Sequence, residues 1–388
     1  MHAPSIHAPR RLRTGALAAS FAAVLLLQAG CSIFDSAPAK SKPLTLPANP
    51  AQHGAQLAWR ANVGTLPATA TASVVQNQLF MVNAAGEISV LNAQGQVQTR
   101  ASLGAAPTTG VGSDGKHMAA VTRDNDLLVF AQGKEVWRQR LPAQSYTTPV
   151  VAGERVFVLL ADRSVMAFDG ENGAKLWHLQ RSSTQQDTLV LKHPGTLLAM
   201  GNTLVAGVGP RLYGINPNSA QLQWDIPVAN PRSTNDVERL VDVVDHPYRA
   251  GAVLCARAYQ AAVACIDTQA EKLVWVAQDK GIEGLGGDRV HVFGADADGR
   301  VRAWLGQTGQ LTWTNEKLLF RNLSAPTAWA DSVALGDSSG KLFFLKPTTG
   351  DLLEYQDTDG SGVRSTTLWG EQLIVITRAG GVFAYKAK

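Results

Sequence analysis

One short phrase recurs along this chain of 388 residues and limits the folds that it can adopt. At Gly170–Trp177 the phrase reads GENGAKLW, a turn that leads into a strand carrying Trp. The same Trp position recurs at Trp59, Trp137, Trp224, Trp275 and Trp313. Two further copies carry Thr99 and Glu354 in its place. Self-similarity at a regular period indicates a repeat architecture, in which each unit packs against the next.

Hairpins with alternating apolar residues accompany the phrase. They span Leu79–Asn92, Met118–Phe130, Val156–Asp169, Leu204–Asn216, Val253–Asp267, Val290–Leu305, Val333–Lys346 and Leu373–Lys386. A shorter strand and a tight turn precede most of these eight hairpins. Each unit therefore holds four short strands in about 40 residues, the size of a propeller blade. The sequence predicts an all-β fold, a single eight-bladed β-propeller of four-stranded blades.

The two ends of the repeat predict how the ring closes. The first Trp strand, near Leu57–Ala61, precedes the first hairpin, and no Trp strand follows the last hairpin at Leu373–Lys386. We expect these two segments to share one blade, which would remove two open sheet edges. Within the phrase, Gly supplies the turn. The Trp ring is expected to fill the wedge between neighbouring blades rather than to hold a ligand.

The charge of the chain gives no reason to expect a nucleic-acid partner. Arg10, Arg11 and Arg13 contribute three of the four positive charges in the formal net charge of +4, and residues 1–30 contain no Asp or Glu. The rest of the chain is nearly neutral, so it lacks the basic surface that binds phosphate backbones. With 45% apolar and 17% charged residues, the composition is that of a folded protein.

The first part of the chain has the pattern of a bacterial export signal. Arg10–Arg13 form a positive region, and Ala16–Leu27 form an apolar stretch too short for a typical membrane-spanning helix. Leu27–Cys31 read LQAGC and resemble a lipobox, although Gln28 stands where an aliphatic residue is usual. We expect lipidation of Cys31. The alternative is a plain secretory signal followed by an incidental Cys.

This leader predicts the domain organisation and the location. We expect a signal peptide over residues 1–30, a lipidated Cys with a flexible tether over residues 31–50, and the propeller over residues 51–388. The tether is expected because this stretch is rich in Pro, Ser and Ala and lacks periodicity. Ser32, where Asp would retain a lipoprotein elsewhere, resembles the sorting rule for outer-membrane lipoproteins. It implies a lipid-anchored protein on the periplasmic face of the outer membrane.

Two other cysteines, Cys255 and Cys265, flank one hairpin, CARAYQAAVAC. With a three-residue loop they would face each other across the strands, and a disulfide could form in an oxidising periplasm. With a two-residue loop they would be offset by one residue and would point to opposite faces. The sequence leaves both alternatives open, and in either case the role of the pair is structural.

The sequence lacks the common catalytic signatures. It has no G-x-S-x-G elbow, no H-E-x-x-H, no P-loop and no zinc-type C-x-x-C. Asp296 and Asp298 lie in a stretch typical of a hairpin tip, and Asp357 and Asp359 lie in half of a Ca²⁺-binding loop that lacks the final Glu. We therefore expect no catalytic, metal-binding or cofactor-binding residues and no enzymatic activity.

The pattern D-x-x-x-G-x-x-x-W resembles the repeat of the pyrroloquinoline-quinone dehydrogenases. That family stacks its quinone between a Trp and a vicinal Cys–Cys pair over a Ca²⁺, and this chain has no adjacent cysteines. We interpret the resemblance as a shared blade design, because a fold by itself does not carry a function. A quinone-dependent periplasmic enzyme is the alternative function.

Two insertions interrupt the repeat and mark candidate functional loops. They span Arg181–Gly195 and Asn230–Pro247. The first insertion places Leu189, Val190 and Leu191 in a polar stretch. These three residues either begin the next inner strand and point inward, or form an exposed apolar patch beside charges, which would suit a protein partner.

The lipobox, tether and propeller together resemble the BamB family, the lipoproteins of the β-barrel assembly machine. The sharpest segments are STNDVERLVDV at Ser233–Val243 and RNLSAPTAWADSVALGDSSGKLFFL at Arg321–Leu345. The resemblance covers essentially the whole chain. It implies a non-catalytic scaffold that binds BamA within the Bam complex and assists insertion of outer-membrane proteins. Exposed blade edges could also pair with outer-membrane protein precursors. An unrelated propeller adaptor lipoprotein is a further alternative.

The resemblance also implies a binding site. In the family, a Leu-Ser-Leu-Arg loop and an Asp of a second loop contact a POTRA domain of BamA. Carried over to this chain, the site consists of Leu189, Leu191, Lys192, Arg239 and Asp242. Lys192 replaces the Arg of the family, which loses bidentate geometry. Val244 stands where the family has a second Asp, and Asp245 follows it.

Overall fold

A computed structural model describes residues 41–180, 191–230 and 240–388 of the chain. Residues Pro43–Lys388 belong to one compact unit. Within the described residues the regular secondary structure consists of strands alone. That part of the chain accordingly forms no helix with the length and apolarity needed to cross a bilayer.

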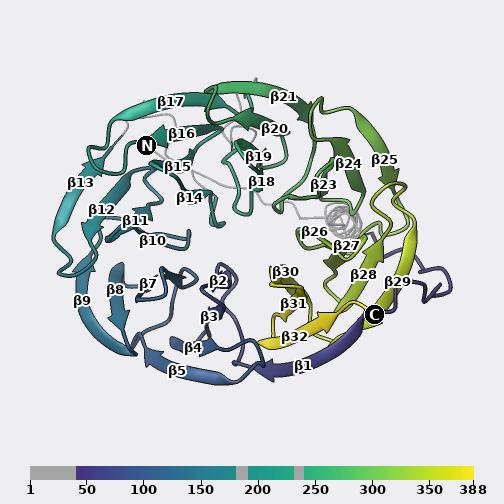
Figure 1. Cartoon of the computed structure of the whole chain (residues 1–388), viewed down its shortest axis with the longest axis horizontal. Coiled ribbons are helices and arrows are strands. Elements are labelled where there is room, and N and C mark those ends of the chain that lie inside the picture. The colour runs from purple at the N-terminus through teal and green to yellow at the C-terminus, as the bar shows by residue number, and fades with distance from the viewer. Residues whose placement is uncertain (1–40, 181–190, 231–239) are drawn as a thin grey trace, which may run out of the picture. The chain divides into compact units, whose positions relative to one another are not determined.

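The strands form eight separate four-stranded antiparallel sheets, which follow one another around a ring (Figure 1). The predicted eight-bladed β-propeller is therefore confirmed. Blade 1 contains β2 (Ser73–Val75), β3 (Gln78–Val82), β4 (Glu87–Leu91) and β5 (Val97–Ser102). Blade 2 contains β6 (Gly112–Ser113), β7 (His117–Val121), β8 (Asp126–Ala131) and β9 (Lys134–Arg140). Blade 3 contains β10 (Val150–Ala152), β11 (Arg155–Leu159), β12 (Val165–Asp169) and β13 (Lys175–Leu179). Blade 4 contains β14 (Leu197–Met200), β15 (Thr203–Val208), β16 (Arg211–Ile215) and β17 (Leu222–Pro227).

The other half of the ring repeats the same order from the innermost to the outermost strand. Blade 5 contains β18 (Tyr248–Ala250), β19 (Val253–Ala258), β20 (Ala262–Asp267) and β21 (Lys272–Gln278). Blade 6 contains β22 (Gly286–Gly287), β23 (His291–Ala295), β24 (Val301–Leu305) and β25 (Leu311–Asn315). Blade 7 contains β26 (Thr327–Trp329), β27 (Ser332–Gly336), β28 (Lys341–Leu345) and β29 (Leu352–Asp357). Blade 8 contains β30 (Val363–Trp369), β31 (Gln372–Thr377), β32 (Gly381–Lys386) and β1 (Gln56–Asn62).

The ring closes as predicted. β1 pairs antiparallel with β32, so that Trp59 lies opposite Ala384 and Asn62 lies opposite Gly381. The sheet order is β1-β32-β31-β30, which makes the first strand the outermost strand of the last blade (Figure 1). Backbone hydrogen bonds between the two ends of the propeller sequence therefore complete the last blade and close the ring.

The middle strands of each blade form its core, because neighbouring blades cover both faces of the sheet. All five residues of β7 are buried, and so are all five residues of β27. The outermost strands alternate instead. In β21, Trp275 is buried, whereas Val274 and Val276 on either side are exposed. Continuous burial in the middle and alternation at the rim are the patterns expected for sheets stacked face to face.

The recurring Trp joins each blade to the next. Trp137 of blade 2 donates a hydrogen bond from Nε1 to the carbonyl of Gly170 in blade 3 at 2.9 Å. A Cβ on Gly173 would lie 2.6 Å from the Trp137 ring, and Gly173 has a φ of +73°. Gly is therefore needed both for its backbone conformation and for the space that the ring occupies. The same contact joins Trp59 to Gly95, Trp275 to Gly309 and Trp313 to Gly350.

Blade 7, whose phrase carries Glu354 instead of Trp, is completed by residues that precede β1. Glu354 Oε2 accepts a hydrogen bond from the backbone N–H of Gly54 at 2.6 Å. The ring of His53 packs against Trp329 and Phe344, with centroid distances of 5.4 and 4.7 Å. The N-terminal segment thus supplies an aromatic ring to the blade that lacks the usual Trp.

Residues 43–55 run along blade 7, and we call them the strap. We expected the first part, up to residue 50, to belong to a flexible tether, but it is bound to the sheet. Asn49 donates from Nδ2 to the Tyr355 carbonyl at 2.8 Å and accepts from the Tyr355 N–H at 3.1 Å. The N–H of Gln52 donates to the Leu353 carbonyl at 3.0 Å. A segment rich in Pro resists helix formation but can still extend along a sheet edge.

Cys255 and Cys265 form a disulfide between β19 and β20. The hairpin pairs Ala258 with Ala262, which leaves a loop of three residues and places the two cysteines directly opposite each other. Of the two loop lengths that the sequence leaves open, the chain adopts the one that permits the bond. Both cysteines are buried within blade 5.

Replacing both cysteines with Ala is expected to lower the free energy of unfolding by about 2–3 kcal/mol, because the disulfide shortens the unfolded chain by a loop of about ten residues. Urea unfolding of the oxidised protein and of the double variant measures the difference. The reduced wild-type protein is the control, and it should match the variant. Equal unfolding midpoints for the oxidised protein and the variant would contradict a stabilising role.

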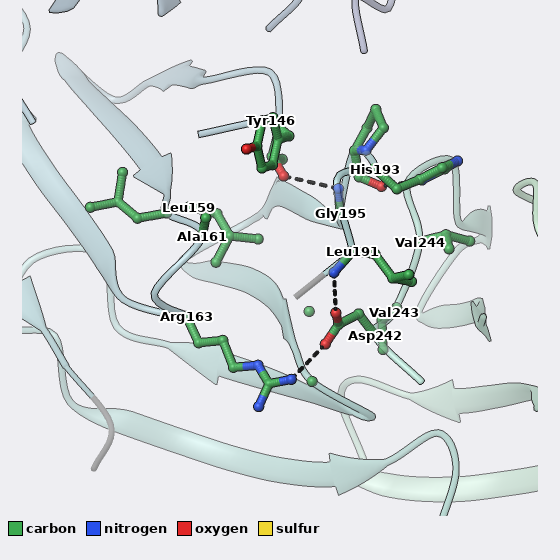
Figure 2. A pocket seen from close by; sticks show the side chains of 15 residues that line it. Tyr146, Leu159, Ala161, Arg163, Leu191, His193, Gly195, Asp242, Val243 and Val244 are labelled. Atoms are coloured by element: carbon green, nitrogen blue, oxygen red, sulfur yellow. Dashed lines mark hydrogen bonds and ion pairs between the residues drawn. The ribbon is translucent and has the colours of Figure 1, made fainter. Parts of the chain in front are cut away.

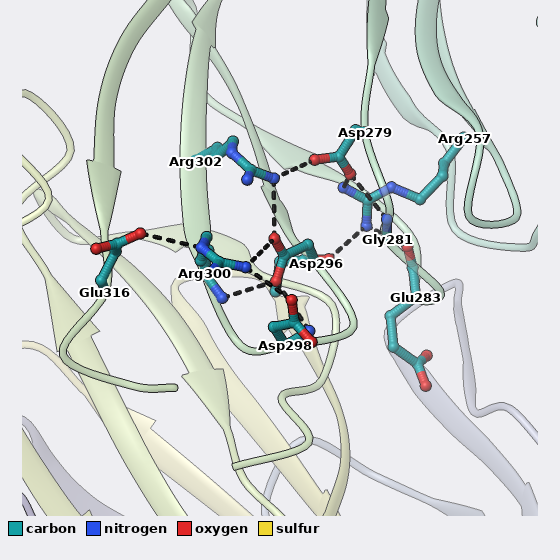
Figure 3. A network of polar contacts seen from close by, with 10 residues as sticks. Arg257, Asp279, Gly281, Glu283, Asp296, Asp298, Arg300, Arg302 and Glu316 are labelled. Atoms are coloured by element: carbon teal, nitrogen blue, oxygen red, sulfur yellow. Dashed lines mark hydrogen bonds and ion pairs between the residues drawn. The ribbon is translucent and has the colours of Figure 1, made fainter. Parts of the chain in front are cut away.

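A buried charged network joins blades 5 and 6 (Figure 3). Arg257 on β19 is fully buried, and it donates from Nη2 to Asp279 Oδ2 at 2.7 Å and from Nη1 to the Ala295 carbonyl at 2.9 Å. Arg302 on β24 donates to Asp279 Oδ1 at 2.6 Å and pairs with Asp296 at 3.1 Å. Burial lowers the pKa of Arg257, and the neighbouring carboxylate of Asp279 opposes that shift.

Candidate functional site

The two insertions of the repeat meet at a pocket on blades 3 to 5, which we call the loop pocket (Figure 2). Leu191 precedes β14 and Asp242 precedes β18, and both line a cavity of about 50 Å³. Other lining residues are Tyr146, Leu159, Ala161, Arg163, Val243 and Val244. Cavities that hold cofactors measure roughly 300 Å³ or more. The loop pocket has instead the size for the tip of an inserted side chain.

The wall of the pocket from Asp242 to Val244 is fixed by backbone hydrogen bonds on both sides. Toward blade 4, the N–H of Val243 donates to the Gly209 carbonyl at 2.9 Å. Toward blade 5, the N–H of Val244 donates to the Arg257 carbonyl at 3.0 Å. Val243 and Val244 are buried. Val243 and Val244 therefore lie between blades 4 and 5 and are bonded to both.

Asp242 connects this wall to the first insertion. Its Oδ2 accepts a hydrogen bond from the backbone N–H of Leu191 at 3.0 Å, and its Oδ1 accepts one from Arg163 Nη2 at 3.1 Å (Figure 2). The side chains of Asp242 and Arg163 are only 19% and 16% exposed. Most of the carboxylate is thus used inside the protein. Asp242 determines where Leu191 lies rather than offering a free charge to a partner.

Lys192 supplies the exposed positive charge beside the pocket. Its ammonium Nζ lies 5.9 Å from the centroid of the Tyr146 ring, at the outer limit of a cation–π contact. Among the described residues it forms no ion pair with a carboxylate. The pocket therefore combines an apolar cavity with a neighbouring cation that can meet an acidic group.

The structure brings together Leu191, Lys192 and Asp242, three of the five residues carried over from the family. Leu189 and Arg239, the other two, lie outside the described residues. Leu191 is half-buried, and β14 begins only at Leu197. At this residue the alternative of a new inner strand does not hold, because the side chain lines the pocket.

Val244, at the position of the second Asp of the family, is buried against the blades. Asp245 does not take over that position. Its carboxylate lies 3.8 Å from His246 and lines a different cavity, where the inner segments of six blades meet. The departure from the family motif therefore leaves Asp242 as the only carboxylate lining the loop pocket within the described residues.

Arg163 and Tyr146 belong to the site but were not predicted. Arg163 lies in the turn between β11 and β12 with a φ of +65°. The sequence signals that turn, but nothing in it indicates that the guanidinium reaches Asp242 in another blade. Tyr146 precedes β10 and likewise has no local signal.

A small cavity lies where the inner segments of six blades meet. It measures about 20 Å³ and is lined by His193, Asp245, Glu283 and Arg364, among others. This volume holds about one water molecule, and a second cavity of about 260 Å³ shares Thr71, Asp245 and His246 with it.

The two acidic stretches considered as Ca²⁺ sites serve as turns. Asp296 Oδ1 accepts hydrogen bonds from the backbone N–H groups of Asp298 and Arg300, and Arg300 pairs with Asp298 at 2.7 Å. Asp357 pairs with Lys341. Across residues 41–180, 191–230 and 240–388, no three His, Cys, Asp or Glu side chains gather as metal ligands.

Comparison with known proteins identifies the family. The family described as outer membrane protein assembly factor BamB matches residues 84–315. An outer membrane protein assembly factor BamB from Bordetella pertussis is 30% identical over 92% of this chain and 93% of its own length. The chain belongs to the BamB family. The crystal structure of BamB from Moraxella catarrhalis has the same fold, with a TM-score of 0.77, 20% identity and coverage of 86% of this chain and 99% of that chain.

A quinone enzyme shares the fold with the BamB family. Quinohemoprotein alcohol dehydrogenase from Comamonas testosteroni matches with a TM-score of 0.66 and 14% identity, over 88% of this chain and 78% of its own. At this identity the likeness concerns the fold alone. It agrees with a shared blade design as the origin of the repeat.

Proposed function

We propose that this chain is a non-catalytic scaffold lipoprotein of the outer-membrane β-barrel assembly complex, and that it binds the POTRA domains of BamA through the loop pocket. One observation carries the proposal. Leu191 and Asp242, which match two separate family motifs, line the same pocket and are joined by a hydrogen bond. Curated relatives along nearly the whole chain are named outer membrane protein assembly factors.

The pocket also suggests the chemistry of the contact. Its apolar cavity can receive one apolar side chain, and Lys192 beside it can pair with a carboxylate of the partner. Buried apolar anchors contribute most of the affinity of such interfaces, whereas exposed charge pairs contribute mainly to association rate. We therefore assign most of the affinity for the partner to the apolar contact of Leu191. The charge of Lys192 is assigned the association rate and the specificity.

The anchor and the location are part of the same proposal. Cys31 carries the lipid after removal of the signal peptide, and the chain is held at the periplasmic face of the outer membrane. No catalysis is proposed, because the relatives that match nearly the whole chain are named assembly factors.

The Leu191→Asp variant tests the site. Binding of the chain from Ser32 onward to the periplasmic domains of a matching BamA is measured by calorimetry. The variant is expected to lose about a hundredfold or more in affinity, because a charge would enter an apolar contact. Leu311→Asp is the matched control, since Leu311 is exposed on blade 6, away from the pocket. Failure of the unmodified chain to bind would overturn the scaffold function, and binding that survives in Leu191→Asp would overturn the site.

Two further variants test the role of Asp242. Asp242→Ala and Arg163→Met are both expected to weaken binding about tenfold, because each removes a link that positions Leu191. Amide hydrogen exchange at Leu191 should become faster in Asp242→Ala. Arg138→Met is the control, because it breaks an exposed pair with Glu135 on blade 2. Unchanged exchange at Leu191 together with weaker binding would mean that Asp242 contacts the partner directly.

A further inference from the structure

The strap gives the N-terminal part of the chain a fixed point of exit from the propeller. We propose that this exit turns the rim of blades 6 and 7 toward the membrane surface when the chain is lipid-anchored. The inference rests on the lipidation of Cys31 within the proposed function. It concerns a surface other than the loop pocket and a different partner, the lipid bilayer itself.

A buried clamp holds the first residues of the strap. The N–H of Leu44 donates to the Leu319 carbonyl at 3.2 Å, and the Leu44 carbonyl accepts from Arg321 Nη2 at 2.6 Å. Arg321 also donates from Nη1 to Asp337 Oδ2 at 3.0 Å. Arg321 and Asp337 are only 8% and 1% exposed. A buried arginine that pairs with a carboxylate and still reaches the strap backbone is costly to disrupt.

The remaining strap residues continue the attachment along the edge of β29. Leu46 packs against the apolar cluster of blades 6 and 7. The Tyr355 hydroxyl donates to the Pro47 carbonyl at 3.4 Å, and Gln356 Nε2 donates to the Ala55 carbonyl at 2.8 Å. The pairing of Asn49 with Tyr355 lies between these contacts. Contacts at both ends and in the middle make the strap part of the propeller. We call residues 31–42, which lie between the lipidated Cys and the strap in the sequence, the leash.

The strap also determines how far the propeller can lie from its anchor. From Cys31 to Pro43 a fully extended chain spans at most about 40 Å, and a flexible chain of that length has a mean end-to-end distance of about 20 Å. If the leash began at Gln56, the extended limit would be about 85 Å. Attachment of the strap therefore shortens the leash. It also moves the point where the leash joins the propeller from blade 8 to the junction of blades 6 and 7.

The location of the exit leaves the loop pocket accessible. Blade 7 and blade 3 lie across the ring from each other (Figure 1). The loop pocket is built on blades 3 to 5, whereas the clamp lies where blade 6 leads into blade 7. Holding the clamp near the bilayer directs the loop pocket toward the periplasm, where a soluble domain of a partner can approach it.

Fluorescence quenching on lipid vesicles tests this orientation. The full-length lipidated protein is attached to vesicles of phosphatidylethanolamine and phosphatidylglycerol that contain an energy acceptor in the headgroup region. A dye is placed through Lys317→Cys beside the clamp, or through Lys175→Cys on β13 across the ring; both positions are exposed. Quenching is expected to be several-fold stronger at position 317 than at position 175. Equal quenching at both positions would overturn the inference.

Two strap variants complete the test. Arg321→Met combined with Asn49→Ala should release the strap and make quenching at the two positions similar. A Gly/Ser insertion of about fifteen residues after Lys42 leaves every strap contact in place and lengthens the leash, so it should also reduce the difference. A difference that persists in both variants would overturn the role of the strap. Protein that does not float with the vesicles would overturn the anchor, while calorimetry with BamA domains reports on the scaffold function separately.

Discussion

Replacing Trp137 with Ala is expected to lower the free energy of unfolding by about 3–5 kcal/mol. The ring is 8% exposed and lies on Gly173 of the next blade. Its removal would leave a cavity between blades 2 and 3 and would leave the Gly170 carbonyl without its indole donor. Urea unfolding followed by far-ultraviolet circular dichroism measures the loss without relying on tryptophan fluorescence.

Gly173→Ala provides the complementary variant on the other side of the same contact. The added methyl group would overlap the Trp137 ring and would strain a residue with positive φ. Because both changes disrupt one joint, the double variant should lose less than the sum of the two. Val136→Ala is the matched control, since Val136 lies beside Trp137 on β9 and is 46% exposed. Equal losses in Trp137→Ala and Val136→Ala would contradict the proposed joint.

Replacing Arg257 with Met is the second change with a large expected effect, about 3–5 kcal/mol of unfolding free energy. Met keeps the unbranched stem but removes the guanidinium, so the Ala295 carbonyl loses a donor. Among the described residues, the buried carboxylate of Asp279 then keeps only Arg302 as its cationic partner. Thermal and urea unfolding of the variant measure the change.

The control for this prediction is Arg138→Met. Arg138 pairs with Glu135 at 2.8 Å, but both side chains are well exposed. Surface pairs of this kind contribute about 0–1 kcal/mol, so the control should barely change the stability. If Arg257→Met cost no more than Arg138→Met, the network of Figure 3 would not be a structural joint between blades 5 and 6.

The repeat made the fold predictable because each phrase carries one half of the joint to the preceding blade and one half of the joint to the following blade. The Gly of a phrase receives the Trp of the preceding blade, and the Trp of the same phrase reaches the following blade, as Gly173 and Trp177 illustrate. Strand pairing inside a blade is also local in the sequence. Even ring closure could be inferred, since the unpaired Trp strand near Trp59 had one open blade to complete.

The site was less predictable from sequence. Leu191, Lys192 and Asp242 were named through a family resemblance, and no periodicity marks them. The contact between Arg163 and Asp242 joins residues from different blades, so its existence depends on how the ring places them. The same holds for Tyr146 beside Lys192.

By itself, then, the sequence determined the all-β class, the number of blades and the partner strand that closes the ring, because these depend on local periodicity repeated many times. Only the tertiary structure decided the loop length that lets Cys255 and Cys265 pair, the attachment of the strap to β29, and the internal use of the Asp242 carboxylate. Each of these depends on contacts between particular backbone or side-chain groups. Such a contact forms only when the surrounding blades bring its two partners to bonding distance.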